Sequence, residues 1–456
     1  MLLSQMPLRK GNYKVLAVAS LGQFLGNGLS VLVGVMLPLM EIGRRPELSA
    51  FQQGLTGCIA LIGIMVGSLI LGRLSDRYGY LLFYRLCPVL ALAASLVAAF
   101  TVDWYAMVAL LFLIGFSVGG EYSLDSAYIS ELMPDKWKVF MVGVAKATSA
   151  LGAVLFALAG FLILKCAMDE HVWHYMFLLV SAVALIMLLS RIKAHESPQW
   201  LMAHGKIAEA QKTVREILGS DIEISVPDSK PEPEAAKPKP FSDMLKGKNL
   251  LRAIFCGVPW ACEGLGVYGF GVFLPVLCIA LGIEHSIGTE ANVVQHLDKV
   301  LNSIKVTTVV NCFMIPGFIA GLFLLRKVYH PALQTWGFIV AAAGLGLLLF
   351  AYETQAAAWL SIAGLAIFEI FLNAGPHLMT FILPSQIYPV SDRSQGSGLA
   401  ASIGKSGAVL AVFFIPMLLQ AGGARLVLWV SIAVMLAGAL LTAVLAPVVL
   451  PRKQKD

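Results

Sequence analysis

Residues 426–448 read LVLWVSIAVMLAGALLTAVLAPV, a run without a single charged side chain. A helix that crosses a bilayer needs about 20 consecutive, mainly apolar residues, and this run is long enough to be one. Similar runs recur along the whole chain, and they lack the alternating polarity of the strands of a membrane barrel. The sequence therefore predicts an all-α membrane protein.

The apolar runs predict twelve membrane spans, which fall in two groups of six. They cover residues 15–39, 52–72, 82–101, 105–132, 139–165, 173–190, 250–281, 303–325, 333–352, 358–383, 396–420 and 426–448. A long polar segment separates the sixth run from the seventh. We therefore expect a six-helix bundle over 1–190, a cytoplasmic loop over 191–249 and a second six-helix bundle over 250–456.

The composition does not fit the common soluble classes of protein. Of 456 residues, 58% are hydrophobic and 13% are charged, and the mean hydropathy is +0.80. A soluble domain has about 25% charged residues. This argues against an ordinary soluble enzyme, a disordered chain, a nucleic-acid binder and a secreted disulfide scaffold. The seven cysteines show no paired ligand spacing, which predicts free buried thiols, and no metal or cofactor is expected.

The basic residues predict the orientation in the membrane. When the N-terminus is placed inside, most lysines and arginines fall on that side, and the net charge of +6 gathers there. No small-residue cleavage pattern follows the first apolar run, so we expect it to be a retained helix. The prediction is a multi-pass protein of a bacterial inner membrane with both termini in the cytoplasm.

The loop over 191–249 contains two kinds of segment. Residues 199–218 carry apolar side chains at helical spacing, which predicts an amphipathic helix at the membrane surface. Residues 227–240 read PDSKPEPEAAKPKP, which is typical of a flexible linker.

One motif occurs at the same place in each group of six runs. The fourth run ends with Glu131-x-x-Pro-x-x-x-Lys138, and the tenth ends with Gln386-x-x-Pro-x-x-x-Arg393. Polar, proline and basic residues also cluster wherever helices leave a membrane. Because the two copies occupy equivalent runs, an internal duplication is the better interpretation.

The segment after the second run resembles the signature of the major facilitator superfamily. It reads Gly72-Arg-Leu-Ser-Asp76-Arg77-Tyr-Gly79, although the basic pair that normally follows is missing. The resemblance implies that Gly72 lets two helices approach closely and that Asp76 meets a neighbouring helix N-terminus. These residues, with Glu131, Lys138, Gln386 and Arg393 of the repeated motif, are expected to latch one conformation of a transporter.

Further segments resemble the branch of sugar-porter-like proteins and metabolite–proton symporters. Residues 196–201 (ESPQWL) are similar to its P-E-S-P-R-W-L segment, and residues 119–122 (GGEY) are similar to its G-G-D-Y. Residues 375–398 and Lys405-x-Gly407 follow the branch's tenth and eleventh spans. Two groups that the branch associates with proton coupling are absent. Gly26 stands at the acidic position of the first span, and Leu111 stands at the arginine position of the fourth.

Four polar residues in the first six runs are candidates for contact with substrate or protons. An ionisable group in mid-membrane costs at least ~3 kcal/mol, so such groups usually face a cavity. Glu121 fits a proton carrier or a carboxylate locked to a lysine, and Asp125 lies one turn away on the same face. Lys146 fits a substrate contact or a snorkelling cation, and Asn27 fits a cavity hydrogen bond or a contact between helices.

Five candidates lie in the last six runs. Lys405 fits a cation that binds an anionic substrate, holds Glu121 or snorkels to the surface. Trp260 and Tyr268 are eight residues apart, which places both on roughly one helix face, and Glu263 lies one residue before the family's acidic position. A histidine is the side chain whose ordinary pKa lies near physiological pH, and His377 lies close to the repeat equivalent of Glu121. Packing roles remain open for Trp260 and His377.

Together these observations predict a secondary transporter that works by alternating access around a central site. The mixture of Lys405, Lys146 and Glu121 favours a small polar metabolite, in particular an organic anion, with proton coupling. A sugar facilitator or symporter and a non-transporting substrate sensor are the alternatives. The segment 403–406 (IGKS) lacks the earlier glycine of a phosphate-binding loop, so ATP is not expected to drive transport. The expected partners are a small-molecule substrate, protons and lipid but no nucleic acid, and the chain is expected to be a monomer and not an enzyme.

Overall fold

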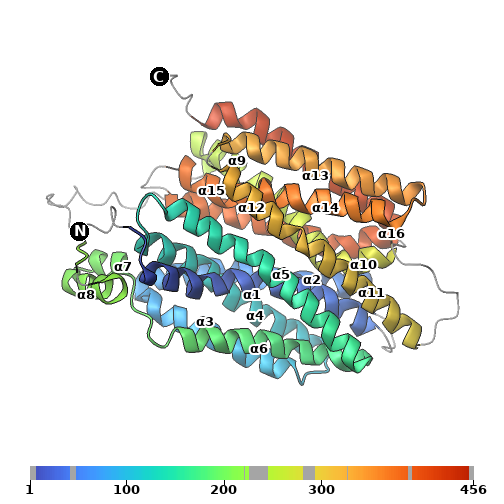
Figure 1. The fold of residues 1–456 in the computed structure, drawn as a ribbon, viewed down its shortest axis with the longest axis horizontal. Helices are drawn as coiled ribbons and strands as arrows, with labels where there is room; N and C mark the ends of the chain where they lie inside the picture. The colour runs from blue at the N-terminus through green and yellow to red at the C-terminus, as the bar shows by residue number, and fades with distance from the viewer. Residues whose placement is uncertain are drawn as a thin grey trace. The chain divides into compact units, whose positions relative to one another are not determined.

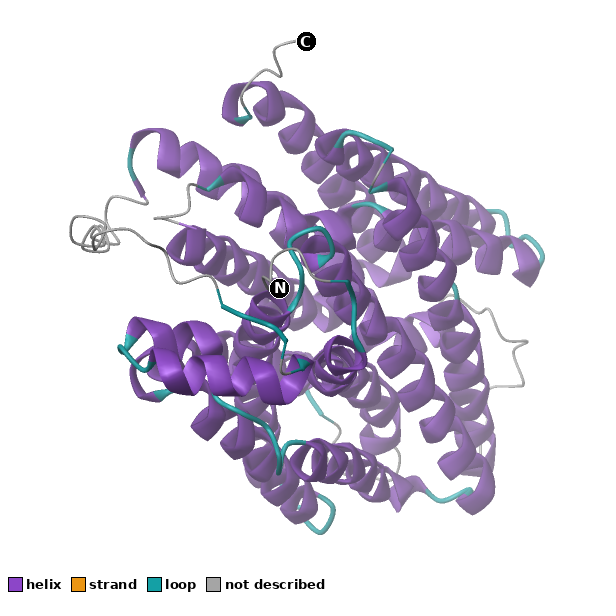
Figure 2. Ribbon diagram, turned by 60° about the vertical axis from the view of Figure 1, so that its left-hand side comes forward, coloured by secondary structure: helices purple, strands orange, loops and turns teal. Residues whose placement is uncertain are grey.

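The computed structural model describes residues 7–41, 48–219, 221–224, 245–280, 293–325, 327–388 and 393–450. In these ranges the chain forms helices joined by short loops, without strands, as Figure 2 shows. The fold class predicted from the apolar runs, all-α with membrane-spanning helices, is confirmed.

Each of the first six apolar runs forms one long helix, and two short helices follow (Figure 1). The six are α1 (Lys10–Glu41), α2 (Ala50–Tyr78), α3 (Tyr80–Ala98), α4 (Trp104–Leu132), α5 (Lys138–Ala167) and α6 (Trp173–Ser190). A short 3₁₀ helix, η2 (Glu170–Val172), precedes α6, and α7 (Pro198–Ala203) and α8 (Ile207–Leu218) come after it.

The later runs are more often interrupted. The seventh run forms α9 (Gly247–Gly264), the π-helical segment η4 (Leu265–Phe270) and α10 (Gly271–Ala280). The others form α11 (Val293–Cys312), α12 (Met314–Leu324), α13 (His330–Glu353), α14 (Ala358–Ala374), α15 (Pro376–Ile387) and α16 (Arg393–Val449). A π-helical segment inside a span is often found at a functional site.

The twelve predicted spans agree with the described helices. Eleven helical segments are long and apolar enough to cross a membrane, and the last of them, Leu399–Val449, combines two predicted spans. Helical geometry breaks within it at Gly422 and at Gly423, where φ is +64°. The eighth span differs in its start, because α11 begins at Val293 rather than near 303. Its first turns are polar, so the helix continues beyond the apolar run that predicted it.

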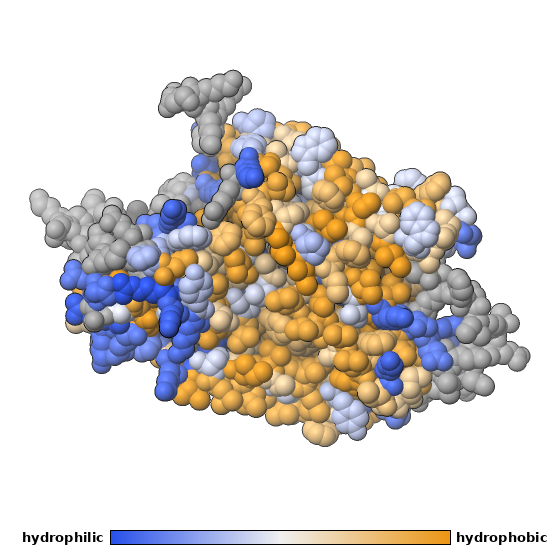
Figure 3. All heavy atoms as spheres, viewed as in Figure 1, coloured by the Kyte–Doolittle hydropathy of each residue, from blue (hydrophilic) through white to orange (hydrophobic). Residues whose placement is uncertain are grey.

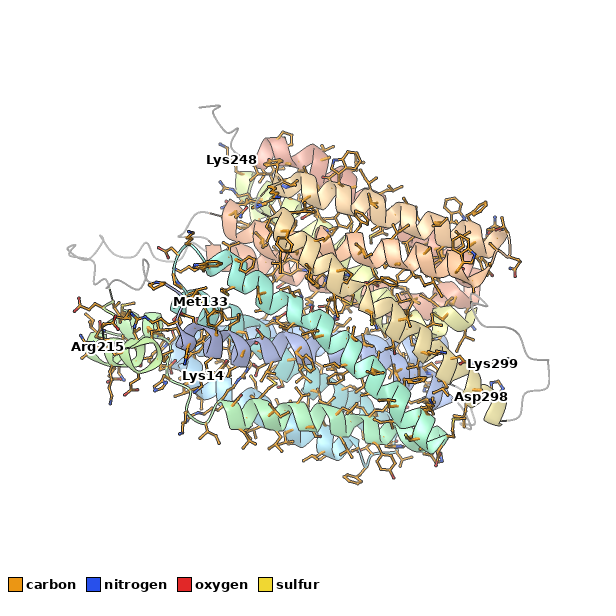
Figure 4. All side chains as sticks on the ribbon, viewed as in Figure 1. Lys14, Met133, Arg215, Lys248, Asp298 and Lys299 are labelled. Carbon is orange, nitrogen blue, oxygen red and sulfur yellow. The ribbon has the colours of Figure 1, made fainter. Side chains whose placement is uncertain are left out.

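The chain forms two compact units. Unit 1 contains Met1–Leu29, Ile62–Gly152 and Phe177–Ala235, and unit 2 contains Ser30–Leu61, Ala153–Met176 and Ala236–Asp456. The helices α1, α2, α5 and α6 each contribute residues to both units. In unit 2, Lys248 lies at one end and Asp298 and Lys299 on α11 lie at the other (Figure 4).

In unit 1, the loop after α6 folds into α7 and α8 against the ends of the spans. Pro198 starts α7, and the Ser197 hydroxyl accepts a hydrogen bond from the Trp200 amide at 3.0 Å, which is a normal N-cap. Hydrophilic atoms cover α7 and α8 in Figure 3, and Arg215 of α8 lies at the same end of unit 1 as Lys14 in Figure 4.

The structure changes the interpretation of the amphipathic segment. Val214 and Leu218 of α8, with Ile222, are buried in a cluster with Val15 of α1 and Leu132 of α4. The apolar face of α8 therefore packs on protein rather than lying in lipid at the membrane surface. The linker predicted at 227–240 lies outside the described residues.

All seven cysteines are free, as predicted, but two of them are not buried. Cys166 and Cys312 are exposed, and both lie at the last turn of a helix, in α5 and α11. Apolar runs predict membrane helices well, but a residue at the last turn of such a helix can point outward.

Candidate functional site

Unit 1 contains a buried cluster of two carboxylates and one guanidinium. The Arg191 guanidinium donates from Nη1 to Glu121 Oε1 at 2.7 Å, and its Nη2 lies 2.6 Å from Glu121 Oε2. The same Nη2 lies 3.4 Å from Asp125 Oδ1. The three side chains are 0–1% exposed. Glu121 and Asp125 project from α4, and Arg191 follows the last residue of α6.

Arg191 is the counter-ion that the sequence prediction missed. The sequence left Glu121 open as a proton carrier or as a carboxylate locked to a lysine. The structure pairs it instead with Arg191, which directly follows the sixth apolar run. The main-chain carbonyl of Tyr84 on α3 accepts a hydrogen bond from Arg191 at 3.0 Å, and the Tyr84 ring lies 3.7 Å from the guanidinium carbon. With every group ionised, this cluster carries one more negative charge than positive.

Lys146 and Asn27 link α5 to α1 within unit 1. The Lys146 ammonium lies 3.5 Å from Gln23 Oε1 and 5.7 Å from the centroid of the Tyr122 ring, and its side chain is buried. The Asn27 side chain donates to the main-chain carbonyl of Ser149 at 3.1 Å. Lys146 therefore stays among α1, α4 and α5 and does not extend to the surface.

The structure explains the absence of a carboxylate in the first span. A Cβ atom at Gly26 would overlap the hydroxyl group of Tyr122 on α4. The space beside Gly26 is therefore filled by Tyr122, the residue that directly follows Glu121. The acidic position of the branch is lost here together with the volume that a side chain would need.

In unit 2, Lys405 is fixed by an aromatic side chain from the seventh span. Its ammonium donates to the Tyr268 hydroxyl at 2.5 Å and lies 4.0 Å from the centroid of that ring. Lys405 is 8% exposed and Tyr268 is 3% exposed. The indole of Trp260 packs directly on Gly404, which precedes Lys405 in α16. Trp260 and Tyr268 therefore contact the same part of α16.

A second buried pair in unit 2 joins Glu263 and His377. His377 Nδ1 is hydrogen-bonded to Glu263 Oε1, and the side chains are 3% and 1% exposed. Glu263 lies near the end of α9, and His377 is the second residue of α15. A separate buried carboxylate, Glu369 on α14, accepts a hydrogen bond from the Asn373 side chain at 3.0 Å.

The segment between α2 and α3 is closed by a residue from the loop after α6. Gly79 has φ of +103°, which favours glycine, and a Cβ there would also approach Glu196 Oε2. Glu196 Oε1 accepts hydrogen bonds from the amides of Tyr80 at 2.7 Å and Leu81 at 3.2 Å. A carboxylate thus stabilises the N-terminus of α3.

Some expected members of the latch are described, and others are not. Gly72 lies in α2, where its carbonyl accepts a hydrogen bond from the Ser75 hydroxyl at 2.7 Å. The side chains of Asp76 and Arg77, and that of Arg393 in the repeated motif, lie outside the described residues.

The repeated motif makes different contacts in its two copies. In the first copy, Glu131 accepts a hydrogen bond from the Ser197 hydroxyl, and Lys138 pairs with Asp135 at 2.5 Å on the surface. In the second copy, Gln386 Oε1 lies 2.8 Å from Nδ1 of His330, the first residue of α13. In both copies the polar residue ties the end of the span to a neighbouring segment.

Comparisons with known proteins agree with this architecture. The chain is 24% identical over 445 residues to the inner membrane metabolite transport protein YgcS of Escherichia coli K12, with 98% of this chain and 93% of YgcS covered. It is 24% identical to the niacin transporter NiaP of Acinetobacter baylyi, with 90% and 88% covered. A partially occluded, inward-open structure of the xylose transporter XylE of E. coli matches with a TM-score of 0.77 at 19% identity, with 96% and 98% covered.

The family model described as "Sugar (and other) transporter" matches residues 39–453, which is most of the chain. The fold is that of the major facilitator superfamily, to which a matched structure of the proton:xylose symporter XylE belongs. Both family and fold are those of transporters rather than enzymes. The chain therefore belongs to the sugar (and other) transporter family.

Proposed function

We propose that this multi-pass membrane transporter moves a small polar metabolite, preferably an organic anion, together with protons and by alternating access. The observation that carries the anion preference is the buried ammonium of Lys405. It is held at 2.5 Å from the Tyr268 hydroxyl, beside the indole of Trp260. A cation inside an apolar bundle is costly to bury, and a carboxylate brought to it offsets that cost through a charge-assisted hydrogen bond.

The interruption of the seventh span supports a substrate site at this place. Tyr268 lies within the π-helical segment η4, between α9 and α10. Broken helices commonly form the sites of transporters, since they free main-chain groups and reorient side chains. A relative named as a niacin transporter supports a planar carboxylate, because niacin is an aromatic acid.

A sugar is the second candidate, and two buried amides favour it. Asn311 Nδ2 and Asn373 Oδ1 are buried and have no hydrogen-bond partner among the described residues. Amide groups of this kind suit the hydroxyl groups of a sugar. The description of the family model and the likeness to XylE support the same candidate.

Thermal unfolding of the purified protein with nicotinate, phosphate and xylose distinguishes these candidates. A compound that binds the folded state raises Tm, by an amount equivalent to about 2.7 kcal/mol at 100 times its Kd. We expect nicotinate to raise Tm, Lys405→Gln to abolish the rise, and Lys405→Arg to retain part of it. A rise with xylose alone, unchanged in Lys405→Gln, would contradict an anion site and favour a sugar facilitator.

Uptake into proteoliposomes then separates transport from sensing. A transporter accumulates nicotinate inside the vesicles when a proton gradient is applied. Binding that is measured by Tm without any uptake would instead indicate a substrate sensor that keeps the transporter fold.

The remaining proposals concern the setting of the protein. We propose that it works as a monomer in a bacterial inner membrane, with both termini and the helices α7 and α8 in the cytoplasm. The bias of basic residues supports this orientation, and the name of the inner membrane relative YgcS supports the location.

A further inference from the structure

The Glu263–His377 pair lies where two spans are interrupted. Glu263 is followed at once by Gly264 and the π-helical segment η4. His377 comes just after Gly375, whose backbone (φ −111°, ψ −94°) separates α14 from α15. The pair is buried, with side chains 1% and 3% exposed. Helix interruptions on both sides allow the two groups to separate without unfolding a continuous helix.

The net charge of this pair depends on one proton. A neutral imidazole beside an ionised carboxylate gives a charge of −1, and one added proton brings the pair to zero. A net charge inside the membrane is costly to bury, whereas a neutral ion pair with a direct hydrogen bond costs less. Protonation therefore stabilises the buried arrangement in which Glu263 and His377 are in contact. Loss of the proton favours an arrangement in which water reaches the pair.

Charged and titratable groups on the surrounding helices have their own contacts. Lys405 on α16 donates to Tyr268 on η4, Glu369 on α14 accepts from Asn373, and His330 of α13 lies beside Gln386. From α12, the Phe318 ring meets the imidazole edge-on with centroids 5.3 Å apart. The other titratable groups on α9 are Lys248, Arg252, Cys256 and Cys262, and α15 carries none besides His377.

We propose that the Glu263–His377 pair is the proton-carrying site of this transporter, an inference that rests on the proposed proton-coupled function. In one half-cycle the pair gains a proton from one side and its charge rises from −1 to zero. In the other half-cycle it releases that proton to the opposite side, and no covalent bond is made or broken. The first half offers no equivalent switch at its counter-ion, because the Arg191 guanidinium does not lose its proton.

Transport by the variants His377→Gln and Glu263→Gln tests this assignment. Two proteoliposome assays with labelled nicotinate are compared. One measures accumulation under a proton gradient, and the other measures exchange without a gradient. We expect both variants to lose accumulation by about tenfold or more and to keep exchange within about twofold. The matched control Glu369→Gln removes a buried carboxylate of α14 outside the pair and is expected to retain both activities.

A measurement without substrate keeps the two proposals apart. Proton uptake by the purified protein between about pH 8 and about pH 6 is expected to fall by one proton in His377→Gln, since a histidine titrates in this range. Undiminished proton uptake in that variant, or gradient-driven accumulation equal to wild type, would overturn the inference. If Glu121→Gln rather than His377→Gln abolishes accumulation, the proton site lies in the first half. If wild type neither binds nor moves any tested compound, the proposed function fails. The proton-uptake measurement still tests whether the Glu263–His377 pair takes up a proton.

Discussion

The two buried ionic clusters each pair a buried carboxylate with a basic side chain, but the basic side chain differs. In unit 1, Glu121 and Asp125 share a guanidinium that is always charged. In unit 2, Glu263 faces an imidazole whose charge depends on pH. Each cluster includes a residue from the fourth span of one group of six. This residue is Glu121 on α4 in unit 1 and His377 on α15 in unit 2.

The difference teaches how equivalent positions can acquire separate roles. A carboxylate that makes two short contacts with arginine has a partner that stays charged at every pH of interest. Such an ion pair can stabilise the packing of α3, α4 and the end of α6. A carboxylate tied to histidine can change its net charge by one proton, which suits it to a step in a cycle. The pattern of buried acidic residues alone does not distinguish them, because the counter-ion decides.

Removal of Arg191 is the strongest way to break this comparison. Arg191→Leu leaves two buried carboxylates without their counter-ion and is expected to lower the free energy of unfolding by about 3–5 kcal/mol. His377→Leu leaves a single carboxylate and is expected to cost less, about 1–3 kcal/mol. Thermal and denaturant unfolding of the purified variants measures both values.

A charge-preserving variant serves as the control for that experiment. Arg191→Lys keeps the positive charge but loses the two parallel contacts with Glu121, so its loss of stability should be intermediate. Equal losses for Arg191→Leu and His377→Leu would mean that the two clusters have the same structural role.

Restoring the missing carboxylate of the first span sharpens the comparison at a smaller cost. Gly26→Asp places a side chain where the Tyr122 hydroxyl lies. The expected loss of stability is about 1–3 kcal/mol, as for other overpacked cores. The combination with Tyr122→Ala should recover part of it, and unfolding of the three proteins is the measurement.

Gly346 supplies a matched control, because no atom lies within 4 Å of a Cβ built there in α13. Gly346→Ala should be neutral or stabilising by up to about 1 kcal/mol.

A Gly26→Asp variant that is as stable as wild type and gains proton-driven uptake would contradict the expected overpacking. It would show that a carboxylate at residue 26 can take part in proton coupling.

The exposed ion pair between Arg9 and Asp221 gives the smallest expected effect. Arg9 Nη1 and Nη2 each lie 2.6 Å from one Asp221 oxygen, and the hydrogen bonds from Arg9 lower the pKa of Asp221 from 3.8 to about 2. The pair therefore stabilises the fold above about pH 4, and this contribution disappears as the pH falls through about 2.

Hydrogen exchange of α8 in wild type and Asp221→Asn measures this contribution. The variant should exchange slightly faster at neutral pH. The two proteins should become equal as the pH falls below about 2, because Asp221 of the wild type is then protonated and, like the asparagine of the variant, carries no charge. A difference that persists at the acid end would show that Asp221 acts through its shape rather than its charge.

The sequence predicts the spans well, because each apolar run must satisfy its main-chain groups within one helix. It does not predict the counter-ion of Glu121. Arg191 follows an apolar run in the same way as the many basic residues that mark the inner side of a membrane protein. Only the packing of α3, α4 and α6 places it inside.

For other site contacts, too, the sequence predicts features within one helix but not contacts between helices. The spacing of Trp260 and Tyr268 predicts a shared face, and both contact α16. The π-helical segment that contains Tyr268 has only repeated glycines as a signal in the sequence. The position of His377 close to the repeat equivalent of Glu121 is visible in the sequence. Its partner Glu263 comes from another helix, and a contact between helices cannot be read from either segment alone.

The close attachment of the segment after α6 has a consequence for engineering. Arg191, Glu196, Ser197 and Asp221 all bind groups of unit 1, so α7 and α8 belong to the first polypeptide half in a mechanical sense. A gene divided after residue 224 would give a first fragment that carries its own cap over the ends of α1, α3 and α4. Fluorescent reporters inserted at the same junction would leave that cap attached to the first fragment.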